Sequence, residues 1–141
     1  MAPLPKPGFL VLLASAFLAA CAGNPATPEI PPPDLAELLR KQGVRQDEPV
    51  ASIPGFSLSG WRFVDDLHII VDNGPGRDYL LTFSFPCRDL AWMDRIGYTT
   101  TAGIFGRLDR IVGRHLGAPV RCPVAEIHRL KPIEPARSPS P

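Results

Sequence analysis

The alternation of apolar and polar positions predicts a β-hairpin in the middle of the chain. Residues 61–72 carry β-branched and aromatic side chains with partial alternation, which is typical of a strand. The alternation assigns side chains to two faces, with Leu67, Ile69 and Val71 on one and His68 and Ile70 on the other. Residues 73–76 (NGPG) form a strong turn signal, and residues 78–84 predict the returning strand.

Three other segments have helical features. Residues 35–42 follow Asp34, a candidate N-cap with Glu37 at the capping-box position, and they end before Gly43. This helix can pack on the domain or lie at a lipid interface. Residues 104–116 place apolar side chains at helical spacing with arginines mostly opposite, although two glycines weaken a helix there. Residues 87–95 predict one or two helical turns.

The remaining segments complete a predicted α+β fold. Residues 43–55 contain Pro49 and Pro54 and predict a loop, residues 96–101 are β-prone, and residues 122–130 predict a final strand. We therefore expect a small antiparallel β-sheet with two or three short helices. The expected division is a leader (1–20), a tether (21–33), a short helix and loop (34–52), the α+β domain (53–131) and a disordered tail (132–141).

The segment Gly8–Cys21 (GFLVLLASAFLAAC) has the pattern of a secretory leader. Lys6 precedes an apolar run that is too short for a comfortable membrane span, and small residues stand before Cys21. A cysteine at this point resembles the lipobox of bacterial lipoproteins, in which it would be acylated and become the new N-terminus. Acyl chains on Cys21 would anchor the chain firmly in membrane lipid. The alternative is an ordinary signal peptide that leaves Cys21 as a simple thiol.

The surroundings of Cys21 predict the location of the protein. Ala22 follows the cysteine, which resembles lipoproteins sorted to the outer membrane, so we expect a lipid-anchored envelope protein facing the periplasm. Residues 22–33 are rich in proline and predict an extended, semi-rigid tether.

Cys87 and Cys122 remain as an even pair, and an oxidising compartment favours a disulfide between them. The closed loop of about 36 residues would contribute roughly 4 kcal/mol in the chain-entropy model. The alternative is that Cys87 is a reactive thiol or a metal ligand. No second cysteine stands near either residue, so the chain has neither a CxxC motif nor zinc-knuckle spacing.

The charge balance argues against nucleic-acid binding. Of the 15 lysines and arginines, Lys6 lies in the leader, which leaves 14 against 14 acidic residues. The basic residues gather late in the chain, between residues 107 and 137. They form either a patch that meets anionic lipid or polysaccharide, or an ordinary solvated face.

The densest polar cluster is Asp65-Asp66 with His68. Asp66 and His68 can share one face of a strand, and with His128 they form a candidate site for proton transfer or a metal. The alternative is a solvent-facing row, and we assign no catalytic residue, no metal and no cofactor. The aromatic residues have core-like spacing, although a sugar-binding groove would use the same types: Trp61, Phe63, Tyr79, Phe83 and Trp92.

A set of short segments resembles an uncharacterised family of small proteobacterial lipoproteins. The segments are Trp61, Tyr79-Leu80-Leu81, Pro86-Cys87-Arg88-Asp89-Leu90, Gly106 to Asp109, and Cys122-Pro123-Val124 with Ile127. The resemblance covers about residues 53–130. It implies paired cysteines and an envelope setting, and it supplies no mechanism.

Three functions are compatible with these features. The first is a non-catalytic envelope lipoprotein whose domain binds another envelope protein or stiffens an assembly. The second is a module that binds glycan or lipid through its aromatic residues and its basic last third. The third is a small metal-dependent enzyme built on Asp66, His68 and His128.

Overall fold

The computed structural model describes residues 33–134 of the chain. The predicted leader, the predicted acylation site at Cys21 and nearly all of the predicted tether lie outside the described residues, as do residues 135–141 of the predicted tail.

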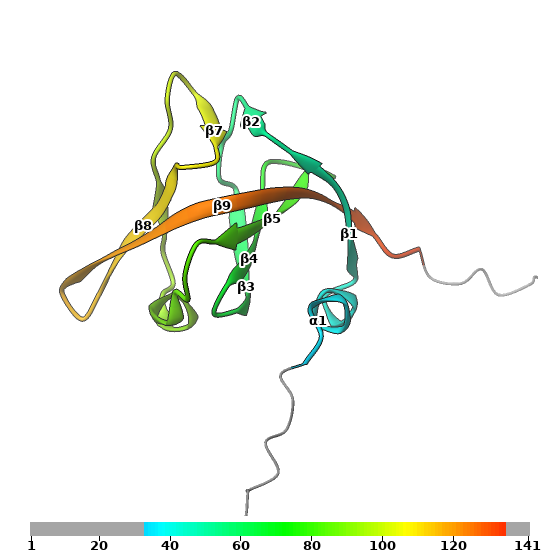
Figure 1. Ribbon diagram of the computed structural model, residues 1–141, viewed down its shortest axis with the longest axis horizontal. Helices are drawn as coiled ribbons and strands as arrows, with labels where there is room; N and C mark the ends of the chain where they lie inside the picture. The colour runs from blue at the N-terminus through cyan, green and yellow to red at the C-terminus, as the bar shows by residue number, and fades with distance from the viewer. Residues whose placement is uncertain (1–32, 135–141) are drawn as a thin grey trace, which may run out of the picture. The chain divides into compact units, whose positions relative to one another are not determined.

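The described part is mostly β-structure (Figure 1). Its elements in chain order are α1 (Leu35–Lys41), β1 (Val44–Val50), β2 (Ser52–Pro54), β3 (Gly60–Asp65), β4 (His68–Asp72), β5 (Asp78–Phe83), the 3-10 helix η1 (Arg88–Trp92), β6 (Gly97–Tyr98), β7 (Ile104–Gly106), β8 (Arg110–His115) and β9 (Ala118–Pro132). The predicted α+β class with two or three helices is therefore wrong, since residues 33–134 contain a single α-helix.

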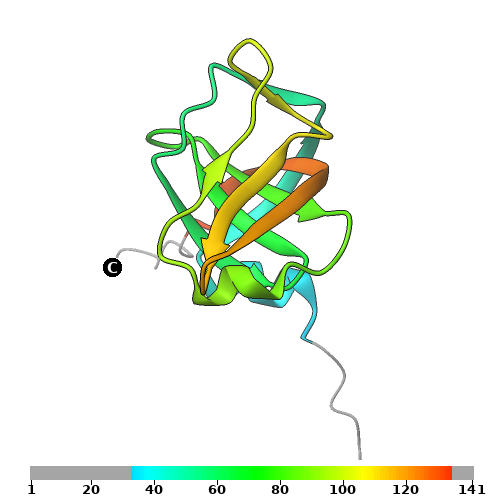
Figure 2. The same ribbon diagram turned by 90° about the vertical axis from the view of Figure 1, so that its left-hand side faces the viewer.

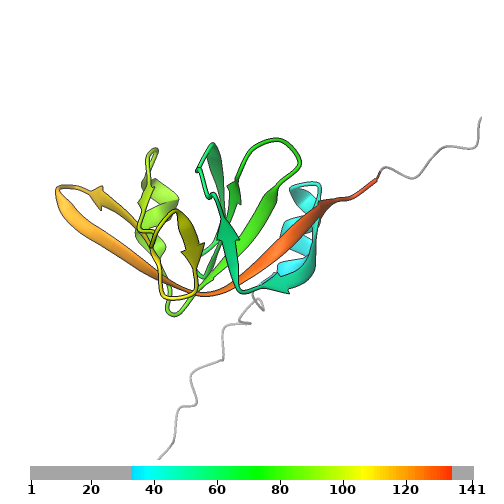
Figure 3. The same ribbon diagram turned by 90° about the horizontal axis from the view of Figure 1, so that it is seen from above.

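The fifteen-residue strand β9 joins the strands into one curled antiparallel sheet. It runs across the whole domain (Figure 1), and the curl is visible from above (Figure 3). The strand order is β3-β4-β5-β9-β8-β6, and β1 also pairs with β9. The first third of β9 pairs with β8, its middle with β5, and its last third with β1. Strands β2 and β7 form a separate two-stranded sheet, which brings the segment after β1 beside the segment before β8.

One face of the sheet holds the main hydrophobic core. Fully buried side chains come from β4, β5, β8 and β9, and the β2–β7 pair adds Ile53 and Phe105. The Phe105 ring stacks on Phe56 at 4.6 Å between ring centroids. The other buried residues of this core are Ile69, Val71, Tyr79, Leu81, Phe83, Cys87, Leu90, Met93, Ile111, Val120, Cys122, Val124 and Ile127.

The opposite face of the sheet is covered in part by helix α1. Leu39 is 1% exposed and packs with Val44, Ile70, Leu80 and Leu130. Of the two alternatives for this helix, packing on the domain is confirmed. Asp34 stands at the N-cap without a side-chain hydrogen bond, so the predicted capping box does not form. Glu37 instead pairs with Lys41 at 3.1 Å.

The helix predicted over residues 104–116 is wrong, because this segment forms β7, a turn and β8. Ile111 is fully buried opposite Cys122, whereas Arg110 and Arg114 at alternate positions of β8 are exposed, which is strand alternation. Leu108, counted as part of the apolar helix face, lies exposed in the turn at φ 79°. The terminal methyl group of Met93 fills the space that a side chain at Gly113 would take, so a larger residue there would have to displace Met93.

Two further predictions fail because strand pairing is decided by distant residues. The predicted loop 43–55 contains β1 and β2, since β1 pairs only with β9 and Pro49 lies at an irregularity of that pairing. The strand predicted over residues 61–72 is two strands, β3 and β4, which turn at Asp66 and Leu67. The Asp65 carboxylate accepts the Leu67 N–H at 2.8 Å and supports this turn.

Several local predictions are confirmed. Strands β4 and β5 pair across the NGPG turn in continuous register, and η1 supplies the short helical segment. Strand β6 lies within the β-prone residues 96–101. The predicted final strand (122–130) exists but is longer, and it extends to Pro132, the first residue of the predicted tail.

The predicted disulfide is also confirmed. Cys87 and Cys122 are bonded with their Cα atoms 6.0 Å apart, and both are buried in the main core. The bond ties the segment that follows β5 to the beginning of β9.

Replacing both Cys87 and Cys122 by alanine should lower the free energy of unfolding by about 3–4 kcal/mol, because the sequence separation of 35 residues gives a large loop-closure term. Urea denaturation followed by circular dichroism measures the change. A reductant should destabilise the wild-type chain to a similar degree and leave the variant unaffected. Equal sensitivity of both chains to reductant would contradict the assignment.

Replacing Leu39 by alanine should lower the free energy of unfolding by about 2–5 kcal/mol, because the buried side chain leaves a cavity between α1 and the sheet. Leu38, its half-buried neighbour on the helix, provides the matched control, and its replacement should cost less. Equal effects of the two substitutions in the same denaturation assay would mean that α1 does not pack through Leu39.

Candidate functional site

The structure gives Asp66 and His68 different partners. The turn at Asp66 and Leu67 brings Asp65, not Asp66, beside the imidazole, and Asp65 Oδ1 lies 2.8 Å from His68 Nδ1. Arg88 Nε donates to the Asp66 carboxylate at 3.1 Å on the exposed side of the turn. A bulge-free strand would have put Asp66 and His68 on one face, but residue 66 stands in a turn.

His128 lies on β9, opposite Leu80 of β5, and is therefore separated from His68 by a whole strand. Its Nδ1 atom is buried without a hydrogen-bond partner in the described residues. Asp66, His68 and His128 are thus not brought together. Between residues 33 and 134, no group of three histidine, cysteine, aspartate or glutamate side chains is placed to hold a metal ion.

A pair of aspartates lies at the other end of the hairpin. Asp72 and Asp78 are directly opposite each other on β4 and β5, and Arg62 donates to Asp78 at 3.1 Å. Burial and then the nearby Asp72 raise the pKa of Asp78, although Arg62 acts in the other direction. The favourable contact here is the ion pair of Arg62 with Asp78, which links β3 to β5.

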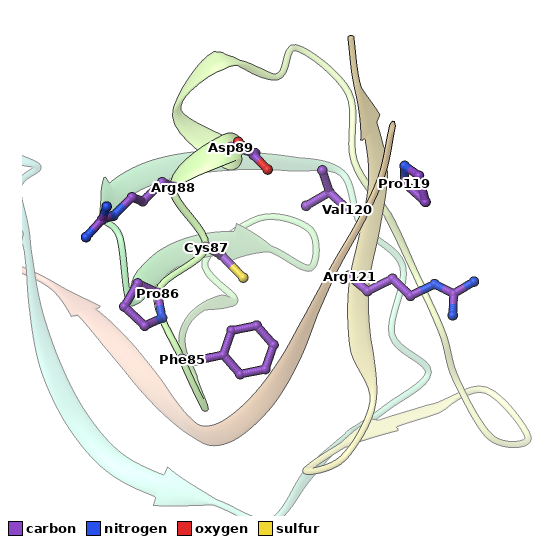
Figure 4. A pocket seen from close by; sticks show the side chains of 8 residues that line it. All are labelled: Phe85, Pro86, Cys87, Arg88, Asp89, Pro119, Val120 and Arg121. Atoms are coloured by element: carbon purple, nitrogen blue, oxygen red, sulfur yellow. The ribbon is translucent and has the colours of Figure 1, made fainter. Parts of the chain in front are cut away.

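A hollow of about 460 Å³ lies beside the disulfide, between the segment after β5 and the beginning of β9. Figure 4 shows the Phe85 ring and the Cys87 sulfur directed into it, while the Arg88 and Arg121 side chains extend to opposite sides. Phe85 is 49% exposed, which is unusual for so large an apolar ring. The lining residues are Phe85, Pro86, Cys87, Arg88, Asp89, Pro119, Val120 and Arg121.

The segment that presents Phe85 and Pro86 is fixed at three points. The Ser84 N–H donates to the Pro123 carbonyl at 3.0 Å, and the Cys87 N–H donates to the Asp66 carbonyl at 2.6 Å. The disulfide adds a covalent link to Cys122. The hollow is therefore a preformed surface rather than a loop that must order on binding.

A second hollow of about 400 Å³ adjoins the first at Pro86. It is mostly apolar, and it lies where helix α1 begins and strand β3 turns into β4. Its lining residues are Pro33, Leu38, Asp65, Asp66, Leu67 and Pro86. Together the two hollows form one surface, which we call the Pro86 surface.

Sequence reasoning missed the Pro86 surface and misplaced one aromatic residue. Trp61, Phe63, Tyr79 and Phe83 contribute to the core as predicted, but Trp92 is 76% exposed on η1. The signal that was available is the Phe85-Pro86 pair directly after a strand, where proline ends the strand and leaves its neighbour outside the sheet.

None of the helices in the described residues has both the length and the apolar character needed to cross a membrane.

The fold and its disulfide define the class of the protein as a small, mostly β domain with one internal cross-link. The chain belongs to a family of unknown function (DUF6491), which matches residues 5–137. No curated protein and no solved structure matches the chain. The match extends well beyond residues 53–130, on which the resemblance to an uncharacterised family was based.

Proposed function

We propose that the protein is a non-catalytic lipoprotein of the bacterial envelope, anchored through acylated Cys21, whose domain binds a partner protein at the Pro86 surface. The leader-like segment Gly8–Cys21 supports the anchor, and the family match includes that segment. The buried disulfide suits an oxidising compartment such as the periplasm. The preformed double hollow is the observation that carries the binding role.

The chemistry of the Pro86 surface fits an extended peptide segment. Phe85 and Pro86 offer an apolar contact, and Arg121 and Asp89 offer charges of both signs at its edges. Arg88 is already paired with Asp66, whereas Arg121 makes no ion pair within residues 33–134. An apolar side chain next to a carboxylate in the partner would therefore satisfy Phe85 and Arg121 together.

Mass spectrometry of the chain purified from a bacterial host's membranes tests the anchor. We expect a mature N-terminus at Cys21 that carries two or three acyl chains, with residues 1–20 removed. Replacing Cys21 by serine should abolish the modification. A chain that begins at residue 21 or 22 without lipid would contradict the anchor and leave the binding role to be tested separately.

Replacing Phe85 by serine should weaken partner binding by about ten-fold or more, because the central apolar contact of the surface is lost. The measurement is quantitative cross-linking and affinity recovery of the full chain from envelope membranes. Arg121→Gln should weaken the same interaction by a smaller factor.

Ile104→Ser is the matched control, since Ile104 is 45% exposed on the separate β2–β7 pair. A partner that is lost with Phe85→Ser and retained with Ile104→Ser supports the proposal, provided that thermal unfolding shows both variants folded. Recovery that is equal for all variants, or recovery of the monomer alone, contradicts it.

Glycan binding is the second candidate, and the exposed indole of Trp92 favours it. In that case the wild-type chain would be retained on peptidoglycan, and Trp92→Ala would abolish retention while Phe85→Ser would not.

A further inference from the structure

The hairpin between β8 and β9 ends in an exposed apolar tip. Its residues Leu116, Gly117, Ala118 and Pro119 are all exposed, and none of them is polar. Leu116 is 94% exposed, more than any other large apolar side chain in the described residues. Exposed apolar residues that are contiguous usually mark an interaction site.

The tip contains a leucine where the backbone favours other residues. Leu116 and Gly117 have φ values of 48° and 83°, which is the pattern of a tight two-residue hairpin turn. Glycine, asparagine or aspartate normally fills the first position, because larger side chains are strained at positive φ. A solvent-exposed leucine therefore adds nothing to the fold that asparagine would not add better.

Three arginines lie on the outer face of the hairpin, two of them near the tip. Ile111 and Cys122 point into the core, so Arg110 and Arg114 on β8 and Arg121 on β9 point away from it. All three are exposed, and none makes an ion pair with an acid in residues 33–134. Arg114 lies directly opposite Pro119, next to the tip.

We propose that this tip inserts into an anionic phospholipid bilayer, with Leu116 in the acyl-chain boundary and Arg114 on the lipid phosphates. Burying a leucine side chain is favourable, and the long arginine side chains can lie along the apolar tip with their charges at headgroup level. Each arginine near an anionic leaflet adds attraction that salt screens. The insertion is a second membrane contact that does not depend on acylation of Cys21.

The position of the tip agrees with a membrane on one side of the domain. In Figure 1 the hairpin tip, η1, the β3–β4 turn and α1 all lie along the lower side, and Figure 2 shows the tip, η1 and α1 there in the perpendicular view. Exposed Trp92 lies on η1 and adds an interfacial aromatic side chain.

Methyl NMR of the full chain on lipid nanodiscs tests the insertion. Leucine and alanine methyl groups are labelled with carbon-13, and the discs contain doxyl-labelled lipid with either mixed phosphatidylglycerol and phosphatidylcholine or phosphatidylcholine alone. We expect the doxyl group to broaden the Leu116 and Ala118 signals several-fold more than the Leu108 signals, and only in anionic discs.

Leu108 is the internal control, because it is 86% exposed at φ 79° and stands at the opposite end of β8, about 25 Å away along the strand. Leu116→Asn suits the turn and should reduce the broadening at Ala118 by about ten-fold, since the leucine transfer energy is lost. Arg114→Gln should reduce it by about five-fold. Leu108→Asn and Arg110→Gln should leave it close to the wild-type value.

Three outcomes would overturn the insertion. They are equal broadening of Leu116 and Leu108, tip broadening that is the same in neutral discs, and signal shifts caused by a soluble anionic polysaccharide in place of lipid broadening. Leu116 and Leu108 are compared within one molecule, and the measurement uses the Cys21→Ser chain without a partner, because Pro119 and Arg121 line the Pro86 surface as well as the hairpin.

Discussion

The backbone ladder of β9 is the interaction on which the rest of the structure depends. One strand pairs with β8, β5 and β1 in turn, so it connects segments from both ends of the described chain. Such a long strand must curve to pack on one core, and the sheet curls with it (Figure 3). The disulfide then fixes the beginning of β9 to the segment after β5, close to the point where the pairing with β8 ends and the pairing with β5 begins on the other edge of β9.

The features that could be predicted from sequence are those decided by neighbouring residues. The NGPG turn allows positive φ at two glycines, so the β4–β5 hairpin needs no distant information. The features that could not be predicted depend on pairing. Val44–Val50 has little apolar character of its own and becomes a strand because the last third of β9 offers a free edge. Residues 104–116 have a helical spacing of apolar positions that the buried partner Cys122 overrides.

The candidate sites show the same division. The pairing of the cysteines followed from their number and the expected compartment, whereas the polar cluster around His68 was misassigned by one residue because a turn replaced a strand. The Pro86 surface combines residues 85–89 with residues 119–121, which are far apart in sequence and meet only through the disulfide and β9. No local sequence pattern predicts such a surface. Phe85 and Trp92 are nevertheless the large aromatic side chains of the described residues that lie exposed outside the core.

The fold explains why the outer positions of the β8–β9 hairpin are polar, but it does not explain why they are positively charged. Strand alternation requires only that the outer positions of β8 and β9 be polar, and that requirement does not specify a single sign of charge. Lys131 and Arg129 in the same strand β9 both have acidic partners on β1, whereas Arg121 and its neighbours on β8 have none in the described residues. The basic residues at the end of β9 are therefore paired with acidic residues of the domain. Arg121 at its beginning, near the apolar tip, has no such pair in the described residues, so its charge is available to an anionic partner.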